Sequence, residues 1–164
     1  MSKNRKIIAF FVLFLIIILM AIIIYFSSRN GVASEKESKT VLNKIIKILF
    51  DDNNGTSITK KQYEYYNFII RKIAHFVLYC SMGILFSIFF RLINVNKIKS
   101  FLYAFSCSLV FAITDEIHQI FSPGRTARVF DVFIDSCGSF LGICLVYIIT
   151  YFILKCRKKS CKEE

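Results

Sequence analysis

Residues 7–26, IIAFFVLFLIIILMAIIIYF, form a run of twenty residues without a charge. At the 1.5 Å rise per residue of an α-helix, this run is about 30 Å long, which matches the hydrocarbon thickness of a bilayer. The alternative is a secretory signal peptide, but the apolar region of a signal peptide is typically shorter, about 7–15 residues. We therefore expect a membrane-spanning helix that stays in the protein as an uncleaved anchor.

Three further apolar stretches follow, at about residues 73–90, 101–121 and 129–154. Because backbone polar groups in hydrocarbon need partners within the protein, spanning segments are helices or closed barrels. The sequence has no series of alternating strands of the kind that builds a barrel. We predict an all-α fold, a polytopic membrane helical bundle with four transmembrane helices, forming a single domain over residues 1–164.

The distribution of charge predicts the orientation of the bundle. The 164 residues include 22 Lys plus Arg against 11 Asp plus Glu, a net charge of +11. On a soluble chain this excess would suggest nucleic acid, but on a membrane chain it marks the cytoplasmic flanks of the spans, so no nucleic-acid partner is expected. Basic residues concentrate in the N-terminal tail, in the loop 91–100 and after Leu154. We therefore place both termini in the cytoplasm and the protein in the cell membrane as a multi-pass protein.

The segment 27–70 is then an external loop. Within it, the apolar residues of 41–49 recur at near-helical spacing between polar ones, a pattern typical of a short amphipathic helix. Gly83, Gly138 and Gly142 lie within the predicted spans and predict close helix–helix approach.

Most ionisable residues of the predicted spans lie toward the external end of the bundle. Such groups are costly in a membrane unless paired or hydrated, so they mark a functional site by default. Residues spaced i, i+4 share one face of a helix, so three helices can direct these side chains into one cavity. The binding candidates are Arg71, Lys72, His75, Tyr79, Gln119, Arg125, Arg128, Asp131 and Asp135, and the catalytic candidates are Glu116, His118 and Asp115.

Three interpretations are compatible with this cluster. In the first, the carboxylates pair with Arg71, Arg125 and Arg128 in a salt-bridge network that only stabilises the bundle. In the second, the arginines bind the phosphate of an anionic lipid head group. An acid–base pair such as Glu116 and His118 then transfers a proton.

The third interpretation is a divalent-metal site built from Asp115, His118, Asp131 or Asp135. Their spacing matches no standard zinc motif, so we assign no metal ligand, and the sequence leaves any cofactor unknown. His75, taken alone, is expected to pack or to form a hydrogen bond rather than to bind metal.

Four motifs together resemble the VanZ-like family of bacterial integral membrane proteins. They are RKIAHFVLY (71–79), TDEIHQ (114–119), PGR (123–125) and DVFIDSCG (131–138), and the resemblance extends over about residues 22–150. The resemblance also includes YFSS (25–28) after the first span, but Arg29 stands where Gln is expected after the two serines. The family takes its name from a protein linked to low-level resistance to the glycopeptide antibiotic teicoplanin, and it is widespread in Gram-positive bacteria.

The resemblance and the polar cluster together predict a role at the outer face of the cytoplasmic membrane. The expected partners are membrane lipids, in particular a phosphorylated envelope lipid or cell-wall precursor. The alternative is a non-catalytic accessory protein in which the cluster is structural. Transport is disfavoured because the inner halves of the spans offer almost no polar lining.

Overall fold

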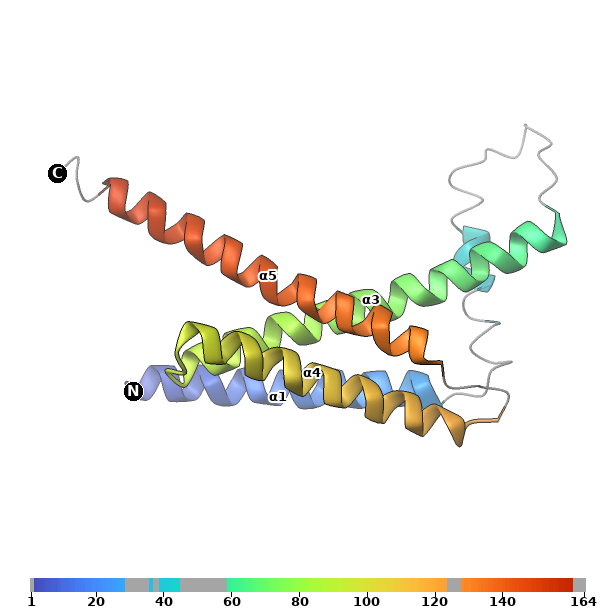
Figure 1. Cartoon of the computed structure of the whole chain (residues 1–164), viewed down its shortest axis with the longest axis horizontal. Helices are drawn as coiled ribbons and strands as arrows, with labels where there is room; N and C mark the ends of the chain where they lie inside the picture. The colour runs from blue at the N-terminus through green and yellow to red at the C-terminus, as the bar shows by residue number, and fades with distance from the viewer. Residues whose placement is uncertain (1, 29–35, 37–38, 45–58, 124–127, 161–164) are drawn as a thin grey trace.

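The described residues of the computed structural model form four long helices (Figure 1). They are α1 (Lys3–Ser28), α3 (Lys60–Leu92), α4 (Lys97–Ile120) and α5 (Val129–Ser160). The structure describes all residues except 1, 29–35, 37–38, 45–58, 124–127 and 161–164. Each of the four helices is long and apolar enough to cross a membrane. The predicted all-α fold with four spans is confirmed, and the chain is a multi-pass membrane protein.

The outward faces of the helices are apolar. Phe10 on α1 is 76% exposed and Phe130 on α5 is 62% exposed, and many aliphatic side chains of the four helices, such as Ile17 and Ile98, are exposed as well. Water would disfavour so wide an apolar surface, whereas the hydrocarbon of a bilayer accommodates it. The long apolar runs of the sequence are therefore divided between a narrow inner core and a wide lipid-facing surface.

Helix α3 begins at Lys60, well before the predicted start of its span, so residues 60–70 are helical. The cause is a capping box. The side chain of Thr59 accepts a hydrogen bond from the backbone N–H of Gln62, and the side chain of Gln62 accepts one from the backbone N–H of Thr59. Both groups occupy backbone donors that would otherwise be unpaired at a helix start.

The predicted amphipathic helix is described in part. Residues 39–44 are helical, and 45–49 lie outside the described residues. Leu42 is buried, and the Tyr63 hydroxyl of α3 donates to Asn43 Oδ1 at 2.8 Å. The described part of this short helix therefore packs against the first turns of α3.

Helix α3 is the central helix, because its contacts with α1, α4 and α5 together are the most extensive in the bundle. Its most extensive contact is with α5, which crosses it (Figure 1). At this crossing, a Cβ atom added to Gly83 would lie 2.2 Å from the backbone oxygen of Ser139, and one added to Gly142 would lie 2.0 Å from that of Cys80. The predicted close approach is confirmed, and it brings backbone against backbone.

The apolar core lies between α1, α3 and α4. Its buried members are Val12, Ile16, Ile23, Tyr79, Met82, Phe111 and Ala112. The start of α1 and the end of α5 lie at the same end of the bundle, on the left in Figure 1. The core therefore separates that end from the polar end described below.

The turn between α3 and α4 depends on two asparagines with different roles. Asn94 has a φ of 64°, a left-handed conformation that asparagine tolerates. Asn96 caps α4, because its Oδ1 accepts a hydrogen bond from the backbone N–H of Lys99 at 3.1 Å.

Replacing Asn96 with alanine should lower the free energy of unfolding by about 1 kcal/mol, because the first turn of α4 loses its cap. The measurement is thermal unfolding in detergent, followed by circular dichroism. Asn94→Gly is the matched control. It removes an amide from the same turn, but glycine readily adopts a positive φ, so its melting temperature should stay at or above that of the wild type. An equal fall in melting temperature in both variants would contradict a capping role for Asn96.

Candidate functional site

Polar side chains from all four helices converge at one end of the bundle. They come from the last turn of α1, the middle of α3, the last turns of α4 and the first turns of α5. The buried members are Ser27, Asp115, Glu116, Gln119 and Asp135, each 5% exposed or less. Four of the residues predicted from the sequence, Asp115, Glu116, Gln119 and Asp135, are thus buried at the same end of the bundle.

Asp115 joins α1 to α4. Its Oδ2 accepts a hydrogen bond from the Ser27 hydroxyl at 2.8 Å and a longer one from Gln119 Nε2 at 3.3 Å. Gln119 also donates to the Ser27 hydroxyl at 3.1 Å. The Oδ1 atom of Asp115 is buried and has no hydrogen-bond partner among the described residues. One oxygen of this carboxylate is therefore satisfied and the other is not.

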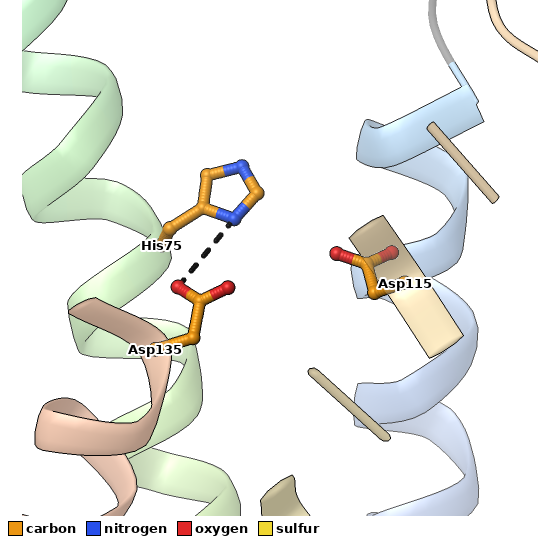
Figure 2. A group of neighbouring side chains, drawn as sticks. All are labelled: His75, Asp115 and Asp135. Atoms are coloured by element: carbon orange, nitrogen blue, oxygen red, sulfur yellow. Dashed lines mark ion pairs between the residues drawn. The ribbon is translucent and has the colours of Figure 1, made fainter. Parts of the chain in front are cut away.

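Asp135 lies opposite Asp115 and is 1% exposed. Neither of its carboxylate oxygens has a hydrogen-bond partner within the described part of the chain. His75 Nδ1 is 3.9 Å from Asp135 Oδ1, which is too long for a hydrogen bond. Figure 2 shows His75, Asp115 and Asp135 around one point, with the two carboxylates on opposite sides.

Lys72 and Glu116 each make contacts at the edge of the site. Lys72 forms an ion pair with Asp131 and lies over the ring of Phe68. Glu116 Oε2 accepts a hydrogen bond from the backbone N–H of Arg128 at 3.0 Å. The hydrogen bond to Glu116 places a carboxylate at the N-terminus of α5, where the helix dipole favours negative charge.

A small cavity of about 20 Å³ opens between these helices. That volume holds one water-sized species. Its lining combines cationic, anionic and neutral polar groups with one aliphatic side chain: Arg71, Lys72, His75, Gln119, Asp131, Ile134 and Asp135. Arg71 has no carboxylate partner within the described residues, and Tyr79 is fully buried beside Asp115 and Asp135.

Other candidates do not meet in this cavity. His118 is exposed, and its Nε2 is 2.8 Å from the Ser28 hydroxyl of α1. Glu116 instead faces the start of α5. Two positions along a helix place side chains about 200° apart, so Glu116 and His118 are not aligned on one partner as the expected acid–base pair. Arg128 has an exposed side chain, and Arg125 lies outside the described residues.

The described residues contain few ion pairs of the predicted salt-bridge network. Among described residues at this end, Lys72–Asp131 is the one pair between a lysine or arginine and a carboxylate. The predicted site residues leave out Ser27 and Ser28, which bond to Asp115 and His118. The available signal was a pair of hydroxyl residues directly after a twenty-residue apolar run.

Comparison with known proteins gives one match. The sequence model of a family described as VanZ/LLP1 matches residues 11–150. The matched region includes most of α1, all of α3 and α4, and α5 as far as Thr150, and so contains every residue of the cluster. No curated protein and no solved structure matches the chain significantly.

Proposed function

The chain belongs to the VanZ/LLP1 family, and from this premise we propose that it binds the phosphate of an envelope lipid or cell-wall precursor at the outer face of the cytoplasmic membrane. The observation that carries the proposal is the position of Arg71, half-buried at the cavity without a carboxylate partner among the described residues. A guanidinium group in such a place is suited to bidentate contacts with phosphate oxygens.

The charge pattern supports the proposed orientation. The opposite end of the bundle contains the start of α1 with Lys3, Arg5 and Lys6, and the turn between α3 and α4 with Arg91 and Lys97. Under the positive-inside rule that end is cytoplasmic, so the polar cluster is on the outside. Glycopeptides act on cell-wall precursors, so a contribution to low-level teicoplanin resistance is part of the same proposal.

The alternative proposal is a non-catalytic accessory protein whose polar cluster holds the helices together. The hydrogen bonds from Ser27 to Asp115 and from Arg128 to Glu116 favour it, because each joins two helices. Buried polar contacts of this kind contribute to helix association in membranes, by about 0.6 kcal/mol on average.

Mass spectrometry of lipids that co-purify with the protein tests the proposal. Wild-type protein should be enriched in a phosphorylated envelope lipid relative to an unrelated membrane protein from the same cells. Arg71→Ala should reduce this enrichment about tenfold, because a hydrogen bond to a charged group contributes about 1.5–3 kcal/mol. Recovery of the lipid in chemically altered form would identify an enzyme.

Arg5→Ala is the matched control, since Arg5 is exposed at the opposite end of the bundle and its one described side-chain contact is with the backbone oxygen of Arg91. Its lipid profile should equal that of the wild type. Equal enrichment in Arg71→Ala, or no enriched phosphorylated lipid at all, would favour the accessory role.

A further inference from the structure

We propose that His75, Asp115 and Asp135 bind one divalent transition-metal cation, such as Zn²⁺ or Mn²⁺. One ligand atom from each residue lies within 4.8 Å of those from the other two. The residues come from α3, α4 and α5, and Figure 2 shows the three side chains around a common point. Metal binding at this site is independent of the proposed function. The role of the bound ion in holding a lipid phosphate rests on that function.

The energetics of the two carboxylates support a cation. Asp115 and Asp135 are both 1% exposed, and three of their four oxygens have no hydrogen-bond partner among the described residues. Two buried carboxylates at this separation repel each other, and burial penalises each charge. The neighbouring lysine, Lys72, already pairs with Asp131. A divalent cation between Asp115 and Asp135 would satisfy the unpaired oxygens and remove the repulsion.

The distances are compatible with one ion after a small closure. Two ligand atoms that are each about 2.1 Å from a shared metal are at most about 4.2 Å apart. The separation of 3.9 Å between His75 Nδ1 and Asp135 Oδ1 is within this limit. The full group, at up to 4.8 Å, requires a contraction of several tenths of an ångström. The adjoining cavity of about 20 Å³ has room for a single water-sized species.

The donor set selects the class of metal. One imidazole nitrogen and two carboxylate oxygens suit Zn²⁺ or Mn²⁺, whereas Mg²⁺ and Ca²⁺ prefer oxygen ligands throughout. Three protein ligands leave a coordination position for water or a phosphate oxygen. With Arg71 beside it, such an ion explains how an anionic head group approaches a site that contains two aspartates.

This ligand set differs from the one considered from sequence. His75 takes the place of His118, which is exposed and bonded to Ser28. Asp131 is paired with Lys72 instead. Because the three proposed ligands come from three different helices, no spacing within one segment predicts them.

Isothermal titration with metal ions alone tests the site. The full chain is purified in detergent with an affinity tag free of histidine, treated with a chelator and titrated with Zn²⁺ and, separately, with Mn²⁺. Wild-type protein should bind one equivalent per chain. His75→Ala, Asp115→Asn and Asp135→Asn should each weaken binding at least about tenfold.

His118→Ala is the matched control, because the chain has 2 histidines and this one lies outside the group. It should bind metal as the wild type does. Absence of stoichiometric binding in the wild type, or equal affinity in His118→Ala and His75→Ala, would overturn the proposal.

Melting temperatures distinguish a variant that has lost the metal site from a variant that fails to fold. Added Zn²⁺ should raise the melting temperature of the wild type, because a ligand that binds only the folded state stabilises it. Asp135→Asn without metal should melt at or above the metal-free wild type, since it removes a buried charge whose oxygens accept no hydrogen bond from the described residues. An equal rise with Zn²⁺ in Asp135→Asn would contradict the site.

The test is independent of lipid. Metal binding without any enriched lipid would leave the metal site standing and remove the proposed lipid function. Enrichment of lipid by a chain that binds no metal would support the proposed lipid function and overturn the metal site.

Discussion

Replacing Gly142 with leucine is expected to abolish the folded bundle. A Cβ atom at this position would lie 2.0 Å from the backbone oxygen of Cys80, far inside van der Waals contact. The obstacle is backbone, so no side-chain rotation can relieve it, and α3 and α5 would have to separate. Overpacking of a well-packed core costs about 1–3 kcal/mol even for modest additions. We expect Gly142→Ala to reach or exceed that range and Gly142→Leu to yield little monodisperse protein.

Size-exclusion chromatography in detergent and thermal circular dichroism measure this effect. The matched control is Ala74→Leu, which enlarges an exposed residue of α3 on the lipid-facing surface. It should elute and melt as the wild type does. If Gly142→Leu also gives a monodisperse peak with an unchanged melting temperature, the close crossing of α3 and α5 is wrong.

Tyr79→Ala is expected to have the second largest effect. The residue is 0% exposed and its ring packs against Phe111 with the centroids 6.1 Å apart. Truncation of a buried aromatic side chain typically costs about 3–5 kcal/mol, because contacts are lost and a cavity remains. The cavity would lie close to Asp115 and Asp135, which neighbour Tyr79. We therefore expect a large fall in melting temperature together with weaker metal and lipid binding.

Tyr79→Phe separates the ring from the hydroxyl. It keeps the packing against Phe111, so its melting temperature should stay much closer to the wild type than that of Tyr79→Ala. A ligand-binding defect in a stable Tyr79→Phe protein would assign the hydroxyl to the site. Equal destabilisation by both variants would show that the ring is not what stabilises the core here.

The sequence predicts the membrane bundle well because length and hydropathy decide it. The uncharged run 7–26 lies within α1, and the later apolar stretches correspond to α3, α4 and α5. Gly83 and Gly142 predict the close crossing, because only a missing side chain permits backbone contact. These features depend on local composition, which is visible in one segment at a time.

The arrangement within the polar end is less predictable. It depends on how each helix is rotated about its axis, and packing between helices sets that rotation. The i, i+4 spacing correctly puts Asp115 and Gln119 on one face, where they share Ser27 as a partner. It cannot say that His75 faces Asp135 while His118 faces Ser28. That information lies in contacts between segments far apart in the chain.

The polar end draws residues from all four helices, and this has a consequence for biogenesis. During synthesis α1, α3 and α4 leave the ribosome first, so Ser27, His75 and Asp115 are present before Asp135. The site is therefore completed only when the last helix inserts beside the others. In a nascent chain that stops before α5, the face of α3 around Gly83 lacks the backbone of α5 that it contacts in the complete protein. An incompletely translated protein therefore differs from the complete one in this exposed face of α3.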